Sequence, residues 1–579
     1  MNKITACPLD CYDACEIVYE NNKIRAVKRG HTQGFLCPHL NHYQEYKTIS
    51  QPRYNGQEIT MQEALLRLKE MLENSKKDEI LHYRGNGNFA LMQEICEHFF
   101  ASFGATLVEG SLCDGAGEAG IIEGRGSNKN MPISEIAKSD VVIFWGRNPH
   151  ATSSHLLPLI KDKKIIVIDP IKTQIANMAD AFLQIKPHHD LFLALLLCRF
   201  LYVQYGVDED YLDEFASEYE DFYELTQSIR IKSALEDMDL SLGQIGDVLE
   251  LVVGKKVAII CGVGIQKYSD GADVMRAIDA FGVMLGVFGH EGSGVAYLGA
   301  SKDGIKTPFN TKAKRISKVD TEFSAFKTVF IQGSNPLSQM PDTSRVRTSI
   351  SNVENIVYFG LHENETSEIA NLVIPAKSFL YKNDVRTSYA HNGMMFMDKV
   401  MECEDGISEY DLTNYLCEEF GIEIESEEFY LECFKSFATK QEDGMWHVGN
   451  RENIPYKNGF DTDTKEFVFL EEFEKSSNKE KGLYLITPKS MMSLNSQFKR
   501  EEFVYLNPSL GFLENEEVLL SSACGNVVLY ARLNEDIRDD CVVIYSGTKG
   551  VNNLTSSKHA LDAKSAIYQE NRVNIEKRG

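Results

Sequence analysis

Four cysteines near the start of the chain have the spacing of a metal-binding group. Cys7, Cys11, Cys15 and Cys37 follow the pattern C-x3-C-x3-C-x21-C. Three close thiolates and one remote thiolate suit the corners of a 4Fe–4S cubane, whose ligands are cysteine sulfurs. Structural zinc more often uses two pairs of close ligands, and unliganded thiols are the third alternative. The grouping therefore favours an iron–sulfur cluster.

A fifth cysteine, Cys113, lies in the glycine-rich stretch GSLCDGAGEAG at 110–120. Its thiol can bind a metal, while the glycines fit the G-x-G-x-x-G fingerprint of a dinucleotide-binding turn. That fingerprint needs a strong strand before the glycines and an acidic residue that ends the second strand about 20 residues later. GATLVEGSLCD is a poor strand, and Asp140 begins a strand instead of ending one. We therefore reject a nicotinamide site at these glycines.

The composition is that of a globular protein with an acidic surface. The chain has 579 residues, 43% of them hydrophobic, and a formal net charge of −25. This charge argues against nucleic acid and anionic membranes as partners. The longest apolar run, 190–206, is too short to span a membrane, contains Arg199 and predicts a buried core helix. Because the N-terminus lacks an export signal, we expect a cytoplasmic protein.

Five apolar, β-branched runs each end in Gly, Asn, Asp or Pro. They cover 139–149, 163–170, 255–266, 326–336 and 354–366. Continuous runs of this kind predict strands buried on both faces of a parallel sheet. Ligands of open α/β sheets bind beyond the carboxyl ends of such strands, so the polar residues that follow the runs are candidate binding residues.

The first and fourth runs end in the same pattern, G-x-N-P. It reads GRNP at 146–149 and GSNP at 333–336. We interpret the pair as a weak internal repeat of two nucleotide-binding units. Two independent strand ends with common turn residues are the alternative. A true repeat would bind two nucleotide-like groups or one large pseudo-symmetric cofactor.

Taken in order, these motifs resemble those of the molybdopterin-dependent oxidoreductases of the dimethyl sulfoxide reductase and formate dehydrogenase type. The four cysteines with GFLCP resemble the family's cluster motif, and SLCDGAGEAG stands where the family carries its protein ligand to the metal. The cofactor-binding blocks of the family resemble WGRNPHATSSH, VIDPIKTQ, GVGIQKYSDG, GSNPLSQMPD and HENETSEIANLVIP. LITPKSMMSLNSQF and VVIYSGTKGVNNLTS resemble its closing barrel. Only the region around 425–480 lacks a counterpart.

The resemblance implies an α/β multidomain fold. We expect an N-terminal iron–sulfur module at 1–50, two interleaved doubly wound α/β domains, and a C-terminal six-stranded β-barrel at 482–579. The first α/β domain would be discontinuous, with residues 51–125 and 305–425, and the second would cover 126–304. Residues 426–481 would form a linker region.

The resemblance also implies the cofactors: a 4Fe–4S cluster, and molybdenum or tungsten held by two molybdopterin guanine dinucleotides. Cys7, Cys11, Cys15 and Cys37 would bind the cluster, and Cys113 would be the catalytic ligand of the metal. Ser111 is a rival ligand, because serine also serves in the family. The remaining candidate cofactor-binding residues are Gly146, Asn148, Pro149, Asp169, Pro170, Gly262, Gly264, Gln266, Gly333, Asn335, Glu365, Thr366, Thr487, Asn495, Ser496 and Asn553.

The function implied is a cytoplasmic two-electron oxidation or reduction of a small molecule. Electrons would pass through the cluster to an iron–sulfur protein or electron-transfer subunit. Asp114, Arg147, His150 and His155 lie in or beside the cofactor motifs and are candidate substrate contacts. Two alternatives stay open: a non-redox hydratase or lyase on the same cofactor, and a scaffold subunit that binds no catalytic metal.

Three positions depart from patterns within the family. His39 stands where many members have lysine, two residues after the fourth cysteine, which leaves the electron relay open. Asp114 follows Cys113 where formate dehydrogenases usually have histidine, which disfavours formate as substrate. The family's tungsten hydratase has aspartate directly after its second cluster cysteine, whereas here Tyr12 follows Cys11 and Asp13 comes one step later.

Overall fold

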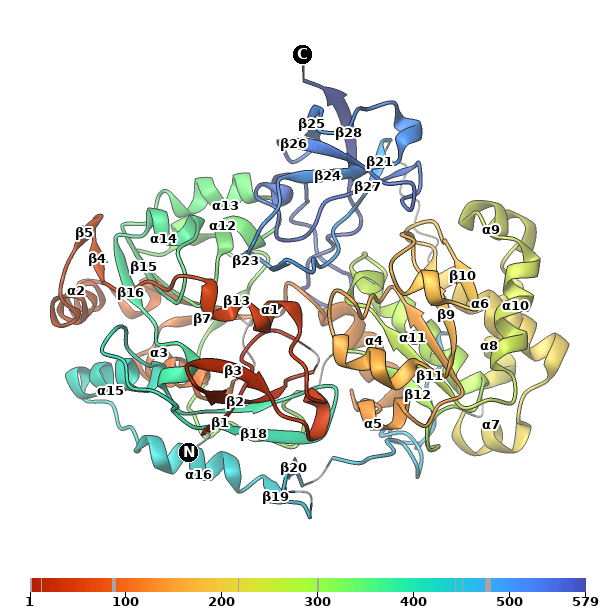
Figure 1. The fold of residues 1–579 in the computed structure, drawn as a ribbon, viewed down its shortest axis with the longest axis horizontal. Coiled ribbons are helices and arrows are strands. Elements are labelled where there is room, and N and C mark those ends of the chain that lie inside the picture. Colours follow the sequence, from red (N-terminus) through yellow and green to blue (C-terminus); the bar gives the residue numbers. More distant parts are fainter. Residues whose placement is uncertain are drawn as a thin grey trace.

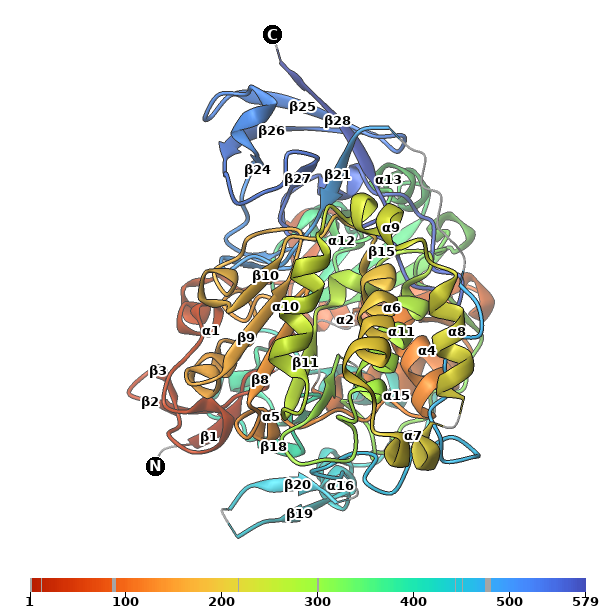
Figure 2. The ribbon, with the colours of Figure 1, turned by 90° about the vertical axis from the view of Figure 1, so that its right-hand side faces the viewer.

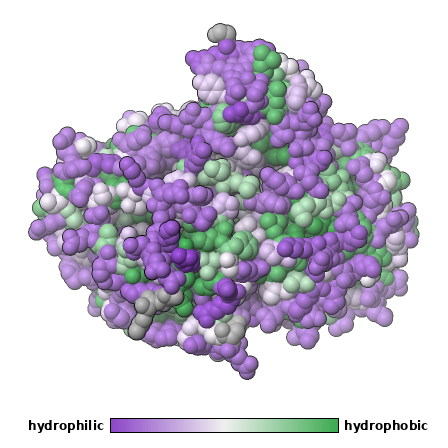
Figure 3. Space-filling view, in the orientation of Figure 1, coloured by the Kyte–Doolittle hydropathy of each residue, from purple (hydrophilic) through white to green (hydrophobic). Residues whose placement is uncertain are grey.

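The computed structural model describes residues 3–11, 13–85, 90–216, 218–298, 301–442, 444–449, 451–473 and 481–578. Two α/β regions lie side by side, the C-terminal barrel lies above them, and the N-terminal strands lie in front (Figures 1 and 2). On this face the barrel and the margins are mostly hydrophilic, and hydrophobic residues gather in the middle (Figure 3). None of the helices in the described ranges combines the length and apolarity needed to cross a bilayer.

The N-terminal module is a three-stranded antiparallel sheet followed by a short helix. Its strands are β1 (Lys3–Ala6), β2 (Glu16–Glu20) and β3 (Lys23–Ala26), in that order, and α1 (Pro38–Asn41) follows Cys37. Asn21 and Asn22 join β2 to β3 with φ angles of 51° and 60°. Such left-handed pairs suit two-residue hairpins, because their twist matches that of the strands. Strands β2 and β3 therefore form a hairpin with these asparagines at its turn.

The five-stranded α/β region is built on parallel strands in the order β10-β9-β8-β11-β12. Alternate side chains of the strands bury against helices on one face and against short helical turns on the other. The predicted core helix at 190–206 is α6, continued by one π-helical segment at 201–205. The elements are β8 (Val141–Trp145), β9 (Lys164–Ile168), β10 (Ala181–Leu183), β11 (Val257–Cys261), β12 (Gly294–Ala296), α4 (Gly115–Arg125), α5 (Ile133–Ile136), α6 (Asp190–Phe200), α7 (Glu209–Phe215), α8 (Tyr219–Gln227), α9 (Ile231–Met238), α10 (Leu242–Val252) and α11 (Gly271–Met284).

The eight-stranded α/β region has its strands in the order β13-β7-β6-β14-β15-β16-β4-β5. The six strands from β13 to β16 run parallel, and β4 and β5 add an antiparallel edge. The elements are β4 (Arg53–Tyr54), β5 (Gln57–Glu58), β6 (Ile80–Arg84), β7 (Thr106–Glu109), β13 (Arg315–Ser317), β14 (Thr328–Gln332), β15 (Asn355–Gly360), β16 (Leu372–Pro375), α2 (Met61–Glu73), α3 (Ile95–Phe103), α12 (Pro336–Gln339), α13 (Thr343–Ile350), α14 (Glu365–Ile369) and α15 (Glu409–Phe420).

One strand expectation was wrong. The stretch GATLVEGSLCD, read as a poor strand, contains β7, and its Thr106, Leu107 and Val108 are buried. Pairing with β6 on one side and β13 on the other supplies hydrogen bonds and burial that stabilise this strand. These contacts come from distant residues and cannot be predicted from the four residues of the strand. The fingerprint glycines that follow lie inside α4. There, a side chain on Gly120 would overlap the carbonyl of Ala272 in α11, so this glycine permits close helix packing.

The two α/β regions share one spatial order of strands. The chain visits these strands in a different sequence, since β11 and β12 follow β8–β10, whereas β6 and β7 precede β14–β16. Reading β10-β9-β8-β11-β12 beside β16-β15-β14-β6-β7 gives two sets of five parallel strands in equivalent order. In this correspondence β8 matches β14, and these are the strands that end in GRNP and GSNP. The shared order supports the predicted internal repeat over the alternative of two unrelated strand ends.

The C-terminal strands close into a six-stranded barrel, β21-β27-β24-β26-β25-β28, as predicted. Residues 426–481, expected as a linker, contain α16 (Glu427–Lys435), β19 (Ala438–Lys440) and β20 (Trp446–Val448), and Phe460, Phe467 and Phe469 join the core of the five-stranded region. Strands β19 and β20 extend a sheet with β17 (Asp384–Thr387) and β18 (Gly393–Met397). The domain boundaries stay a prediction. The barrel strands are β21 (Leu483–Ile486), β24 (Phe503–Leu506), β25 (Glu517–Ser521), β26 (Asn526–Leu533), β27 (Cys541–Val543) and β28 (Arg572–Lys577).

Candidate active site and cluster site

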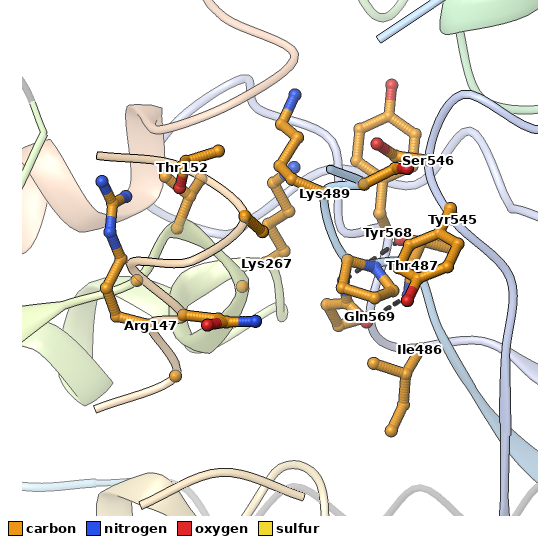
Figure 4. A pocket seen from close by; sticks show the side chains of 18 of the residues that line it. Arg147, Thr152, Lys267, Ile486, Thr487, Lys489, Tyr545, Ser546, Tyr568 and Gln569 are labelled. Atoms are coloured by element: carbon orange, nitrogen blue, oxygen red, sulfur yellow. Dashed lines mark hydrogen bonds between the residues drawn. The ribbon is translucent and has the colours of Figure 1, made fainter. Parts of the chain in front are cut away.

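A cavity of about 730 Å³ lies where the strand ends of both α/β sheets meet the barrel. Its walls include the segments that follow β8, β9, β11 and β14, together with barrel residues. In Figure 4, Arg147 and Thr152 lie on one side, Thr487 and Gln569 lie on the other, and Lys267 lies between them. Each of the corresponding strands thus opens onto one shared space, as expected for ligands of α/β sheets.

Paired glycines shape the cavity in both sheets. A Cβ on Gly262 would overlap the carbonyl oxygen of Gly146, and a Cβ on Gly85 would overlap that of Gly333. Only glycine lets these neighbouring strand ends approach so closely. Gly264 and Gly333 line the cavity, and a Cβ on either would meet no atom within 4 Å. The backbone therefore forms a cradle that a large cofactor can fill.

Cys113 lines the cavity from the loop between β7 and α4. The Ser111 hydroxyl accepts a hydrogen bond from the Cys113 N–H at 2.9 Å and donates to Asp114 Oδ1 at 2.7 Å. Gln266 Nε2 donates to the Cys113 carbonyl at 2.7 Å, and its Oε1 accepts from the Gly117 N–H at 2.9 Å. These bonds engage the backbone of Cys113 and the hydroxyl of Ser111, so they fix the loop without using the cysteine side chain.

The electrostatic surroundings of Cys113 are mixed. Burial raises the pKa of its thiol to about 11, and Asp114 and Asp10 also raise it, whereas Lys267 and Lys489 lower it. For Lys267, burial has the opposite effect and lowers the pKa, and the charge of Lys489 lowers it further. A metal ion at Cys113 would displace the thiol proton, because the thiolate is the form that binds metals.

The four N-terminal cysteines converge in the N-terminal module. All four are free thiols, with Cys7 and Cys15 buried and Cys11 and Cys37 partly buried. Burial raises the pKa of each thiol, and the charge of at least one other member of the group raises it further. Four gathered cysteine sulfurs are the donor set of an iron–sulfur cluster, so these residues fit that group.

The cluster loop is held by a buried arginine. Arg386 of β17 is 0% exposed and donates to the carbonyls of Leu9 at 2.8 Å, Cys11 at 3.3 Å and Pro8 at 3.4 Å. Cys11 itself lines the same cavity as Cys113. The candidate cluster and the candidate catalytic ligand therefore border one space.

Comparison with known proteins identifies the family. The profile of molybdopterin oxidoreductases matches residues 54–419, more than half of the chain. The chain belongs to the molybdopterin oxidoreductase family. The predicted resemblance is confirmed, and membership of the family implies a molybdopterin cofactor with molybdenum or tungsten.

Individual relatives agree with the family match. The chain is 27% identical over 445 residues to the probable oxidoreductase YyaE of Bacillus subtilis (strain 168). The alignment covers 69% of this chain and 66% of that protein. It is 24% identical over 472 residues to formate dehydrogenase H of Escherichia coli (strain K12), covering 69% and 65%. The chain thus spans just under two thirds of these relatives. The structure of acetylene hydratase from Pelobacter acetylenicus matches 100% of both chains with a TM-score of 0.81 at 13% identity, which shows a shared fold.

The structure brings most of the candidate cofactor-binding residues of this molybdopterin oxidoreductase to the cavity. Those that line it are Gly146, Asn148, Asp169, Pro170, Gly262, Gly264, Gly333, Thr487 and Asn495. Seven others are outside its lining: Pro149, Gln266, Asn335, Glu365, Thr366, Ser496 and Asn553. Among the candidate substrate contacts, Asp114 and Arg147 line the cavity, whereas His150 and His155 do not.

Several of the candidates outside the lining form a hydrogen-bond network behind the residues that line the cavity. Asn335 donates to Glu365 at 2.8 Å and accepts from the Thr366 hydroxyl at 2.9 Å. Arg500 of the segment before β24 donates to Glu365 at 2.8 Å and to the Gly547 carbonyl at 2.6 Å. Burial would raise the pKa of Glu365, but these hydrogen bonds and the charge of Arg500 outweigh it and lower the pKa. The network ties the end of β14 to the barrel.

Sequence reasoning missed several residues that line the cavity. Asn552 lines it and donates to the Ser338 carbonyl at 2.7 Å, whereas the predicted Asn553 donates to the Asn526 carbonyl at 3.2 Å. Lys267 and Lys489 lie inside the recognised blocks GVGIQKYSDG and LITPKSMMSLNSQF, and this position is the signal that could have found them. Lys318 also lines the cavity, from the turn after β13, with no such signal.

Proposed function

We propose that this chain is a two-electron oxidoreductase whose metal is held by Cys113 and two molybdopterin guanine dinucleotides, with a 4Fe–4S cluster on Cys7, Cys11, Cys15 and Cys37. One observation carries the proposal. A single cavity receives corresponding strand ends of two sheets with the same spatial strand order, and both Cys113 and Cys11 border it. Two similar halves suit a cofactor with two similar arms, and the shared border suits electron transfer.

Residues around the proposed metal site would have different roles. When bound, the molybdenum or tungsten ion supplies two-electron chemistry at the substrate. Cys113 would hold the ion as a thiolate, on a loop fixed by Ser111 and Gln266. Because Lys267 and Lys489 are close enough to lower the pKa of the Cys113 thiol, they also stabilise negative charge on a substrate placed there.

The same geometry favours Cys113 over Ser111 as the metal ligand. The Ser111 hydroxyl donates to Asp114 and accepts from two N–H groups, those of Cys113 and Asp114. Binding a metal would cost these three hydrogen bonds and release the loop. Cys113 carries no such duty in the loop.

Electrons would travel between the cavity and the N-terminal module. Cys11 borders the cavity, and His39, two residues after Cys37, lies 3.3 Å through Nε2 from the carbonyl oxygen of Ser493 in β22 (Ser493–Leu494). This contact joins the module to the barrel segment that carries Asn495, a cavity residue. His39 therefore stands in the place of the usual lysine as part of the connection, and the redox partner would approach from the cluster side.

A hydratase on the same cofactor is the second candidate. Asp10 lines the cavity, and the Tyr389 hydroxyl donates to its carboxylate at 3.3 Å. A carboxyl group beside the metal can move a proton to or from water without any redox change. Asp13, the acidic residue weighed from sequence for this role, is buried elsewhere and bonded to His155.

Metal and nucleotide analysis of protein purified without oxygen tests the proposal. About four irons, one molybdenum or tungsten and two guanine nucleotides per chain are expected. Cys113→Ala should keep the iron and lose the reduction of redox dyes, while Cys96→Ala, a buried cysteine in another core, should keep both. Iron without the other metals or nucleotide would support the scaffold alternative, and zinc in place of iron would contradict the cluster. A loaded protein that hydrates its substrate without reducing dyes would establish the hydratase.

A further inference from the structure

Another cavity adjoins the one that Cys113 borders, which we call the main cavity. It has a volume of about 480 Å³ and lies at the carboxyl ends of β6, β7 and β13 in the eight-stranded sheet. We call it the side cavity, and its lining includes Arg84, Glu109, Gly110 and Lys318. Ligands of open α/β sheets bind at this edge, so the side cavity is a second place where a small molecule can bind.

Neighbouring residues of the chain separate the side cavity from the main cavity. Arg84, the last residue of β6, lines the side cavity, and Gly85 lines the main cavity. After β7, Gly110 lines the side cavity and Ser111 lines the main cavity. Lys318, directly after β13, lines both. The two cavities therefore meet along one row of strand ends, with Lys318 at their junction.

Ion pairs form much of the wall of the side cavity. Arg84 donates to Glu97 at 2.8 Å and to Glu94 at 3.2 Å. Arg315 donates to Glu97 at 2.9 Å. Lys302 pairs with Glu94. Both carboxylates are largely buried, and each of these three cations therefore has a carboxylate partner in the wall.

Lys318 is a buried cation in different surroundings. Its backbone N–H donates to the Glu109 carbonyl at 2.9 Å, which fixes the point from which its side chain starts. The residue is 5% exposed. Burial and the charge of Arg84 lower the pKa of Lys318 to about 7, although Glu97 and Asp114 raise it. The surroundings thus compensate the positive charge only in part, and an anion beside the ammonium group would stabilise it.

We propose that the side cavity admits a small anion, a carboxylate or an inorganic oxyanion, and that Lys318 is the specificity-determining residue that binds it on its way to Cys113. The inference rests on the proposed function and deepens it, because the anion would be the substrate of the metal site. An ammonium group has three donor hydrogens and forms short, charge-assisted bonds with such oxygens. Beyond the junction, Lys267 and Lys489 line the main cavity, so an anion that passes Lys318 meets further positive charge. A neutral molecule of the same shape gains none of this attraction.

The test is calorimetric titration of the intact holoenzyme with acetate and nitrate, as anionic probes, and with acetamide, which is neutral and has the shape of acetate. At least one anion should bind about tenfold or more tightly than acetamide, because one charge-assisted hydrogen bond is worth this much. Lys318→Met keeps an unbranched side chain without its charge and should weaken binding of that anion by about 10- to 100-fold. Acetamide binding should not change. Lys318→Arg keeps the charge and should restore most of the affinity.

Lys302→Met is the matched control, because Lys302 lines the same cavity but pairs with Glu94. It should bind the anion as the wild type does. A measurement on the wild type alone avoids any loss of folding: cyanate carbamylates neutral amines, and a saturating anion should protect Lys318, but not Lys302, in peptide mass spectrometry. Equal protection of both lysines, or of neither, would contradict the binding site.

Two further outcomes separate this inference from the proposed function. A metal-loaded protein that binds acetamide as tightly as the anions, or whose anion binding survives Lys318→Met, would overturn the inference and leave the oxidoreductase. A protein without molybdenum, tungsten or guanine nucleotide whose anion binding still depends on Lys318 would refute the proposed function. The substrate role would fall with it, and an anion-binding site would stand.

Discussion

The two α/β sheets have the same strand order but use their matching side chains differently. After β8, Asn148 is half-buried, lines the cavity and bonds Gln174 at 2.8 Å. After β14, the matching Asn335 is 2% exposed, is outside the cavity lining and bonds Glu365 and Thr366. The asparagine of the five-stranded sheet therefore faces the cavity, whereas that of the eight-stranded sheet makes hydrogen bonds behind the cavity lining.

The carboxyl groups that follow the next strands repeat this difference. Asp169, directly after β9, lines the cavity, and burial raises its pKa to about 7. Glu365, in the segment after β15, is outside the lining, and its bonds to Asn335 and Arg500 lower its pKa. The backbone positions of the repeat are thus shared, while the side chains have specialised. If each half holds one arm of the cofactor, the two arms are held by different chemistry.

The largest effect is expected where the two sheets agree, at their paired glycines. Gly262→Ala should lower the free energy of unfolding by about 3 kcal/mol, because the added Cβ overlaps the Gly146 carbonyl and only backbone movement can relieve it. Gly85→Ala should act similarly through Gly333. Urea unfolding measures both. Gly264→Ala, whose Cβ meets no atom within 4 Å, is the control and should unfold like the wild type. Equal effects at all three sites would refute the cradle.

The next effect separates the two carboxyl groups by pH. Asp169 has a folded pKa raised to about 7 by burial, above its unfolded value of about 3.9, so its contribution to stability is lost as pH rises between these values. Asp169→Asn lacks this loss, so its free energy of unfolding should rise by about 2–4 kcal/mol relative to that of the wild type between pH 4 and pH 7. Unfolding of the cofactor-free protein across that range measures it. Glu365→Gln should show the opposite dependence, since the lowered pKa of Glu365 gives stability that disappears as pH falls. Parallel pH curves for the two variants would contradict the comparison.

A smaller effect is expected when the buried asparagine is removed. Asn335→Ala should lower the free energy of unfolding by about 1–3 kcal/mol, because it removes one of the partners of Glu365 and the acceptor of the Thr366 hydroxyl. Thr366→Val, which removes the bond to Asn335 and a weak bond from the Leu337 N–H, should cost less. Chemical unfolding at neutral pH measures both. A neutral Asn335→Ala would mean that Arg500 alone satisfies Glu365.

The sequence predicted backbone features better than side-chain roles. Strands such as β8 and β14 were predicted because each is a continuous apolar run with a turn residue at its end. The role of Asn335 could not be predicted, because GRNP and GSNP look alike and only Glu365, 30 residues later, separates them. Lys318 and His155 were missed or misplaced for the same reason: their partners are distant in the chain. Strand β7 was missed because its neighbours, not its own four residues, stabilise it.

The smallest effect on stability is expected at Asn148, and it sharpens the comparison most. Asn148→Ala should change the free energy of unfolding by less than about 0.5 kcal/mol, because the side chain is half-buried and its partners Gln174 and the His150 N–H can turn to water. Asn148→Ala should instead retain less cofactor, measured as guanine nucleotide and metal per chain after gel filtration. Asn335→Ala is the natural counterpart, with lower stability and retention that follows the folded fraction. If both variants lose stability and cofactor together, the two halves use their asparagines alike, and the difference between the sheets is one of geometry alone.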